Sequence, residues 1–246
     1  MEIFVCIDDT DNLDSPGTGH LAEILRRDIV TVFDGTAARI TRHQLFVSDD
    51  IPYTSHNSTM CFTADIRDDL LEGLIAHAQN FLQNSSAEGS DPGLCVAVRN
   101  RIGNMEKLIE YGMNATRKVL SKNEASMLAH QLGVHLSEHG GTGGGIIGAL
   151  AGVGLRLGGN NGRFKGWISV RENDRRITVD QLCRQYQIAD VRDVNGKQLA
   201  GGEVLVLNEK IKTVLLDGKE VLPVKRIMRD GEISWENLSK DEIRRY

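Results

Sequence analysis

A glycine-rich apolar segment at residues 140–159 limits the fold more than any other part of this chain. Its sequence is GGTGGGIIGALAGVGLRLGG. The apolar part, residues 146–157, predicts a helix of small residues, and glycines at every fourth position let another element pack closely against it. These glycines are Gly144, Gly148 and Gly152. The preceding loop, residues 140–145, carries backbone N–H groups that a phosphate group can approach.

The same segment bears on two common nucleotide-binding motifs. Residues 143–148 match the spacing GxGxxG, but that fingerprint requires a preceding strand. We expect a helix at residues 127–136 instead, which argues against a Rossmann domain. The pattern GxxxxGK[ST] does not occur in the sequence, which excludes a P-loop.

Three carboxylates follow the first expected strand. Residues 1–7 are almost continuously apolar, which predicts a buried strand, and Asp8, Asp9 and Asp11 come directly after it. Carboxylates this close repel one another, and Mg²⁺ is a cation that commonly offsets such repulsion. The alternative is a solvated turn whose carboxylates accept hydrogen bonds from backbone N–H groups.

Two details bear on residues 8–11, the acidic turn. A calcium-binding loop starting at Asp9 is excluded, because its sixth position is Asp14 instead of glycine and its twelfth is His20 instead of Glu. Thr18 stands at an expected helix start. It is either the N-cap of that helix or a hydroxyl that faces a metal and phosphate site.

Composition excludes several classes of protein. The chain has 246 residues, 40% of them hydrophobic, and a formal net charge of -5, which argues against a broadly basic nucleic-acid coat. No apolar run of about 20 residues is present, so we expect no membrane span. The cysteines are scattered, which argues against a zinc ribbon or finger and favours a reducing, cytoplasmic compartment. They are Cys6, Cys61, Cys95 and Cys183.

Several histidines are candidates for a functional role. His56 lies in the polar loop of residues 53–57, and we expect it to contact an acceptor substrate. His43 is expected on a strand, facing outward. His135 and His139 are expected on one face of a helix, but no HExxH pattern accompanies them, so metal binding there is not favoured.

The overall pattern predicts an α+β protein. Helices are expected at residues 20–28, 68–82, 105–119, 124–136, 146–157 and 179–186. Strands are expected at residues 1–7, 38–47, 59–64, 94–98 and 167–170, and the chain after residue 188 is strand-rich, with turns at Asn195-Gly196, Gly201-Gly202 and Asp217-Gly218.

Several of these segments occur together in one known family. The segments are IDDTD at 7–11, a threonine at 18, IPYTSHN at 51–57, DPG at 91–93 and GGGIIGALAGVG at 143–154. In this order they resemble the tRNA-isoleucine agmatidine synthetase (TiaS) family, over roughly residues 1–175. That family uses ATP to activate a cytidine in the tRNA anticodon for attack by agmatine.

The resemblance implies a domain organisation and a set of site residues. Residues 1–58 and 120–175 would form a kinase-like ATP-binding α/β domain, residues 59–119 a ferredoxin-like insert, and residues 176–246 a strand-rich segment. Asp8, Asp9 and Asp11 would hold Mg²⁺, and Thr18 would handle phosphate. The nucleotide would be bound by Thr142, Gly143, Gly144, Gly145 and Gly148.

The chain also departs from the family. It has no cysteine pattern for the zinc ribbon, residues 53–57 lack the family's Lys and Arg, and no basic residue precedes residues 146–154. We therefore expect a relative of the catalytic part, an enzyme that transfers a phosphoryl or nucleotidyl group from Mg²⁺–ATP to RNA or a small molecule. The alternatives are a nucleotide- or metal-binding module without turnover, and a subunit that docks a partner chain or a second copy through residues 188–227.

Overall fold

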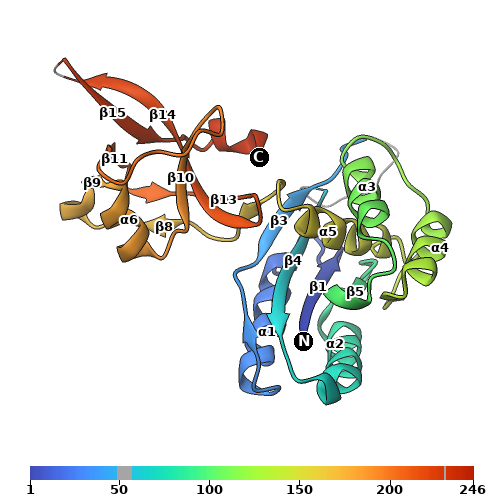
Figure 1. The fold of residues 1–246 in the computed structure, drawn as a ribbon. Helices are drawn as coiled ribbons and strands as arrows, with labels where there is room; N and C mark the ends of the chain where they lie inside the picture. The colour runs from blue at the N-terminus through green and yellow to red at the C-terminus, as the bar shows by residue number, and fades with distance from the viewer. Residues whose placement is uncertain (49–56, 230) are drawn as a thin grey trace. The chain divides into compact units, whose positions relative to one another are not determined.

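The computed structural model describes residues 1–48, 57–229 and 231–246. The chain forms two compact units, Met1–Gly158 and Gly159–Tyr246 (Figure 1). Among the described residues, no helix combines the length and the apolar character needed to cross a bilayer.

The sheet of the first unit is built around β1 (Glu2–Asp8), which has an antiparallel neighbour on each side. β4 (Ser58–Asp65) pairs with one side of β1 and β5 (Gly93–Val98) with the other. Within this unit the strands follow the order β6-β5-β1-β4-β3, and β2 also pairs with β4. The other strands are β2 (Thr36–Ala37), β3 (Thr41–Gln44) and β6 (His135–Glu138).

Helices cover both faces of this sheet, as Figure 1 shows. Side chains of β1 alternate between the two faces, because successive residues of a strand point to opposite sides. Ile3, Val5 and Ile7 pack with α1 and α2, whereas Phe4 and Cys6 pack with α3, α4 and α5. The buried strand expected at residues 1–7 is therefore confirmed. The helices are α1 (Thr18–Thr31), α2 (Leu71–Ser85), α3 (Met105–Ala115), α4 (Lys122–Leu132) and α5 (Ile146–Gly158), with short 3-10 turns at Asp68–Leu70 and Arg99–Arg101.

The glycines of α5 let it pack against α3 almost backbone to backbone. A Cβ atom at Gly154 would lie 2.1 Å from the carbonyl oxygen of Leu108, and one at Gly112 would lie 2.8 Å from the carbonyl oxygen of Ala151. Gly148 and Gly152, two of the glycines whose spacing predicted close packing, instead face β1, where their Cβ atoms would lie 1.7 Å from Asp8 Oδ2 and 2.4 Å from Cys6 Sγ.

Gly154→Ala is expected to lower the free energy of unfolding of the first unit by about 1–3 kcal/mol. Its new methyl group would collide with backbone atoms of α3, which cannot rotate away as a side chain could. Urea unfolding followed by the helical circular dichroism signal measures this. Gly73→Ala is the control, since the nearest atom to its Cβ is 4.0 Å away and it lies in α2. It should raise stability by about 0.5–1 kcal/mol. Equal effects of the two changes would contradict the proposed close packing.

The helix expected at residues 124–136 is wrong in its last four residues, 133–136. α4 ends at Leu132 because Gly133 adopts a left-handed conformation, with φ of 68°, and caps it. β6 then begins at His135 and precedes the glycine-rich loop. A strand instead of the expected helix thus precedes the glycine-rich loop, and the direction of its pairing argues against a Rossmann domain. β6 pairs antiparallel with β5, whereas that fingerprint belongs to a parallel βαβ unit.

The strands beside β1 bear on the expected division into domains. β4 and β5 flank β1 on both sides and come from residues 59–119, so the insert proposed there would share one sheet with residues 1–58. The boundary expected between residues 175 and 176 falls inside the second unit.

The second unit is strand-rich, as expected for most of its length. Its strands follow the order β7-β13-β14-β15-β11-β9, with β10 parallel to β14, and β12 pairs with β8. The helix expected at residues 179–186 is α6 (Val179–Tyr186), and a capping box of Thr178 and Gln181 starts it. The strands are β7 (Arg163–Phe164), β8 (Ile168–Ser169), β9 (Arg176–Thr178), β10 (Asp190–Asp193), β11 (Val204–Val206), β12 (Lys210–Ile211), β13 (Val214–Leu216), β14 (Lys219–Arg229) and β15 (Glu232–Asn237), with 3-10 turns at Glu172–Asp174 and Glu242–Arg245.

Candidate functional site

Asp8 ends β1 and is almost completely buried, with 8% of its surface exposed. Its side chain lies against the first turn of α5, where a Cβ atom at Gly148 would be 1.7 Å from Asp8 Oδ2. Burial raises the pKa of Asp8 well above its usual range, and the charges of Asp9 and Asp11 raise it further. Glycine at position 148 therefore makes room for a carboxylate whose ionised form is unfavourable.

Asp9 follows in a left-handed conformation, with φ of 50°. Burial and the charges of Asp91 and Asp11 raise its pKa to about 6. Among the described residues, no three Asp, Glu, His or Cys side chains gather closely enough to enclose a metal ion. The donor chemistry still fits Mg²⁺, which is commonly bound through one or two carboxylates, with water and phosphate as its other ligands.

Thr18 is the first residue of α1, and its hydroxyl belongs to the acidic turn. It donates a hydrogen bond to Asp11 Oδ1 at 2.6 Å and accepts bonds from the backbone N–H of Thr10 at 3.3 Å and the Thr10 hydroxyl at 3.2 Å. The N-cap of α1 is Gly17, so Thr18 is not the cap. Its hydroxyl is instead held in a buried network beside Asp11, since Thr10 and Thr18 are 1% and 6% exposed.

Asp91 occupies the hydrogen-bond donors of the glycine-rich loop. Its Oδ1 accepts from the N–H of Thr142 at 2.6 Å, and its Oδ2 accepts from the Thr142 hydroxyl and, at 3.4 Å, from the N–H of Gly144. The Asp91 carbonyl accepts from the N–H of Gly145 at 3.1 Å. Although burial opposes it, the bonds from Thr142 and Gly144 hold the pKa of Asp91 below its usual range. The donors expected to meet phosphate therefore meet an internal carboxylate.

Lys122, from α4, places a positive charge beside the same loop. Its Nζ donates to Glu138 Oε2 at 2.6 Å and also to the carbonyl oxygen of Thr142. A Cβ atom at Gly143 would lie 2.5 Å from this Nζ, which places the ammonium group directly against the loop. No basic residue stands directly before residues 146–154 in the sequence, but Lys122 places a basic group beside the glycine-rich loop in the fold.

Arg42 is a second cation that sequence reasoning missed. It lies on β3, where its Nε donates to Ser58 Oγ at 2.8 Å. Burial lowers its pKa, whereas the charge of Asp11 raises it. This guanidinium group therefore interacts electrostatically with the acidic turn.

The structure thus brings most of the predicted site residues together. The acidic turn lies at one end of β1, and Asp8 contacts Gly148 while the backbone of Gly145 packs against the Asp8 carbonyl, where a Cβ would be 3.1 Å away. His56 lies outside the described residues. Asp91 was missed because it is 51 residues from Thr142, and its DPG motif alone does not indicate a bond to the loop.

His43, His135 and His139 are placed differently from what the sequence predicted. His43 was expected to face outward but is fully buried, with its Nε2 2.7 Å from Thr41 Oγ1. His135 and His139 share one face of the β6 segment instead of a helix, and Ser137 Oγ lies 2.9 Å and 2.8 Å from their Nε2 atoms. Burial lowers the pKa of both.

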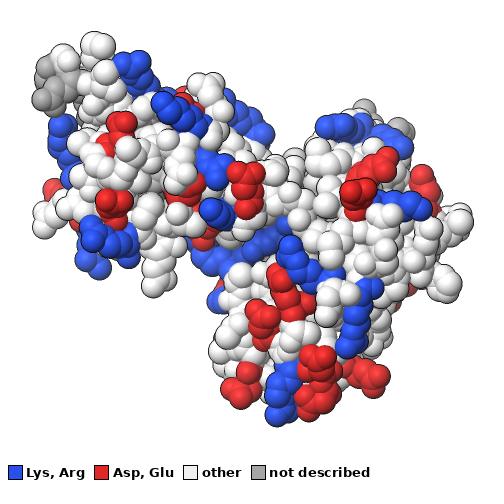
Figure 2. All heavy atoms as spheres, viewed as in Figure 1, with Lys and Arg blue, Asp and Glu red and all other residues white. Residues whose placement is uncertain are grey.

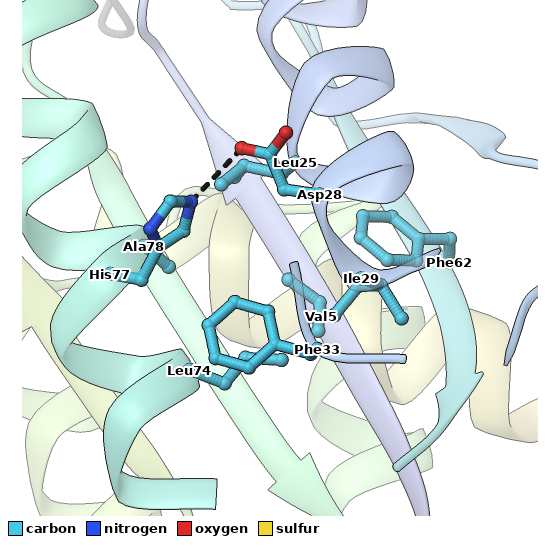
Figure 3. A pocket seen from close by; sticks show the side chains of 9 residues that line it. All are labelled: Val5, Leu25, Asp28, Ile29, Phe33, Phe62, Leu74, His77 and Ala78. Atoms are coloured by element: carbon cyan, nitrogen blue, oxygen red, sulfur yellow. Dashed lines mark hydrogen bonds and ion pairs between the residues drawn. The ribbon is translucent and has the colours of Figure 1, made fainter. Parts of the chain in front are cut away.

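A small apolar pocket lies between α1 and α2 (Figure 3). Phe33, Phe62 and Leu74 are among its lining residues, and Asp28 Oδ2 and His77 Nε2 meet beside it at 2.9 Å. Asp28 is near the C-terminal end of α1, whereas Thr18 begins that helix. The pocket is therefore distinct from the acidic turn.

Comparison with known proteins gives matches only among solved structures. No family model matches this chain, and neither does any curated protein. The structure of TiaS in complex with its tRNA and ATP is 23% identical, with a TM-score of 0.55, and the match covers 71% of this chain and 40% of that one. This chain has a TiaS-like fold.

Two further structures agree. Apo TiaS, described as a tRNA agmatidine synthetase, is 20% identical with a TM-score of 0.55, over 77% of this chain and 44% of that one. A structure described as a tRNA fluorescent labeling enzyme is 22% identical with a TM-score of 0.55, over 77% and 45%. The chain spans less than half the length of these TiaS-like proteins. The resemblance read from IDDTD and IIGALAGVG is thus confirmed at the level of the fold.

Proposed function

We propose that residues 1–158 bind Mg²⁺–ATP and transfer a phosphoryl or nucleotidyl group from it. The observation that carries this proposal is the meeting of the acidic turn with the glycine-rich loop and the first turn of α5, at Asp8, Gly145 and Gly148. A loop of this kind attracts phosphate, and carboxylates beside it supply ligands for the accompanying cation. A TiaS-like fold, solved elsewhere with ATP, supports the same assignment.

Each residue has a distinct part in the proposed chemistry. Of Asp8, Asp9 and Asp11, one or two carboxylates would bind Mg²⁺ directly, and the cation would supply charge neutralisation at the phosphates. Thr18 would orient or accept the transferred group, because its hydroxyl proton is directed at Asp11 Oδ1. The N–H groups of residues 142–145 and of the first turn of α5 would position the phosphates, with Gly148 leaving room for Asp8.

The acceptor is proposed to be RNA or a small molecule, with His56 in contact with it. The TiaS structures solved with tRNA support an RNA acceptor. So does the charge of the second unit, which has 17 Lys and Arg against 14 Asp and Glu, a net charge of +3, whereas the first unit carries −8. Figure 2 shows these basic side chains spread over the second unit with acidic ones between them. Partner chains or a second copy would dock through residues 188–227.

A second candidate function is a nucleotide- or metal-binding module without turnover. The occupation of the loop donors by Asp91 favours it, because a transition state with developing charge would find these donors already bonded. Product formation distinguishes the two candidates.

Titration of ATP into the protein by calorimetry, with and without Mg²⁺, tests the proposal. We expect Mg²⁺-dependent binding and slow release of ADP or AMP, because the carboxylates of the acidic turn repel ATP until a cation offsets their charge. Analysis of ADP, AMP, phosphate and pyrophosphate then identifies the bond that breaks. Tight binding without products would favour the binding module. Absence of binding under both conditions would contradict the proposal and leave only the fold in common with TiaS.

A further inference from the structure

The glycine-rich loop is shaped around the Asp91 carboxylate. Gly141 has φ of 54°, and a Cβ atom there would lie 1.7 Å from Asp91 Oδ1. A Cβ atom at Gly144 would lie 3.2 Å from Asp91 Oδ2. The Asp91 carboxylate also accepts hydrogen bonds from two N–H groups and one hydroxyl. These donors and the two glycines form a concave binding site for one planar anion.

We propose that Asp91 is an internal substitute for the anionic ligand of this loop, and that a phosphate group must displace it in order to bind. The proposal concerns the regulation of the nucleotide site and rests on the proposed function for the identity of that phosphate as part of ATP.

Position and charge make the exchange reasonable. Asp91 is half-buried, so water and ligands reach it, whereas Asp8 is 8% exposed. Asp91 and Asp9 are mutually repelling carboxylates, and this repulsion contributes to the raised pKa of Asp9. When a phosphate takes the place of Asp91, the number of anions seated on the loop does not change. Lys122 remains beside the loop to offset the incoming charge.

The exchange would also reach the acidic turn. Asp91 ends a loop that is bonded to this turn, since the N–H of Ala87 donates to the Thr10 carbonyl at 3.0 Å and Asn12 Nδ2 donates to the Glu88 carbonyl at 3.1 Å. If Asp91 moves away from the glycine-rich loop, these two hydrogen bonds transmit the movement to the segment that carries Asp9 and Asp11.

The test compares anion binding by the wild-type protein and by Asp91→Asn, with calorimetry and two probes, pyrophosphate and Mg²⁺–ATP. The amide of Asn cannot accept hydrogen bonds through its nitrogen, so it competes less well for the loop donors. We expect Asp91→Asn to bind both probes about tenfold more tightly, or more. Asp14→Asn is the matched control, because it removes one exposed charge from the segment after Asp11 without touching the glycine-rich loop. It should bind within about twofold of wild type.

The outcomes separate this inference from the proposed function. Tighter binding of pyrophosphate but no binding of Mg²⁺–ATP by either protein would support the role of Asp91 and contradict the nucleotide assignment. Equal binding of Mg²⁺–ATP by wild type and Asp91→Asn would overturn the role of Asp91 alone. Weaker binding by Asp91→Asn would overturn it as well and would make Asp91 a ligand of the metal.

An equal gain in affinity in Asp14→Asn would reduce the effect to general charge repulsion. No binding of either probe by any variant would overturn both proposals. A thermal unfolding midpoint for Asp91→Asn near that of wild type establishes that the loop is intact, and phosphate should raise this midpoint more in Asp91→Asn.

Discussion

Asp9→Asn should reduce ATP turnover on the order of 100-fold or more, because it removes a charged ligand from a site whose chemistry depends on charge neutralisation at phosphate. Folding should survive the change. Asp9 has φ of 50°, a left-handed conformation that Asn adopts more readily than most residues. The substitution also removes one of the charges that raise the pKa of Asp8. The unfolding midpoint measured without Mg²⁺ should therefore stay the same or rise, while turnover falls.

Asp34→Asn is the control for this prediction. Asp34 has the same φ of 50° but is exposed, away from the residues of the acidic turn. It should leave both turnover and stability unchanged. If Asp9→Asn turned over ATP at the wild-type rate, the assignment of Asp9 as a metal ligand would be wrong, and the turn would be a solvated structure whose carboxylates only accept hydrogen bonds.

Local sequence patterns predicted those elements whose ends are marked by local chemistry. The helix at residues 179–186 is observed with the same bounds, because Thr178 and Gln181 form a capping box that fixes where it starts. β1 was predicted because its apolar residues fill both faces of the sheet. The predicted helix extended beyond the observed end of α4. A single residue, Gly133, ends α4 by adopting a left-handed conformation, and the spacing of apolar residues does not indicate that conformation.

The orientation of strand residues was harder to predict. β3 reads TRHQ, and its alternation does not tell which face is covered by a helix. His43 of β3 pairs with Thr59 of the neighbouring strand β4. Thr59 faces α5, because a Cβ atom at Gly152 would lie 2.7 Å from the methyl group of Thr59. This puts His43 in the core and Arg42 on the other side of the strand. A polar strand is therefore buried by a helix that follows about 100 residues later in the chain.

The candidate site shows the same division between local and distant information. Asp8, Asp9, Asp11 and Thr18 are close in sequence, and the first strand and the helix start were enough to group them. Asp91 and Lys122 enter the site through contacts with Thr142, 51 and 20 residues away. Such contacts depend on the sheet order β6-β5-β1, which places the start of β5 between the acidic turn and the glycine-rich loop. The periodicity of apolar residues in the sequence does not predict that strand order.

Gly93→Ala tests a tightly packed backbone contact in this arrangement. Gly93 begins β5, opposite Asp8 of β1 and Glu138 of β6. A Cβ atom there would lie 2.2 Å from the carbonyl carbon of Gly145 and 2.4 Å from the N atom of Ile146. These are backbone atoms, so no side-chain rotation can relieve the collision. We expect the free energy of unfolding of the first unit to fall by about 3 kcal/mol or more, and any protein that still folds should lose ATP binding because the glycine-rich loop is pushed away from Asp8.

Urea unfolding followed by the helical circular dichroism signal measures the loss, since α1 to α5 all belong to the first unit. The two tryptophans, Trp167 and Trp235, belong to the second unit, so their fluorescence reports separately on that unit. Gly89→Ala is the control for backbone strain, because Gly89 has φ of 81° but open space around its Cβ, and it should cost only about 1–2 kcal/mol. A cost for Gly93→Ala no greater than that of Gly89→Ala would mean that α5 can move away from β5 at little expense. In that case the approach of the loop to Asp8 would be adjustable, and the acidic turn and the glycine-rich loop could not act as one preorganised site.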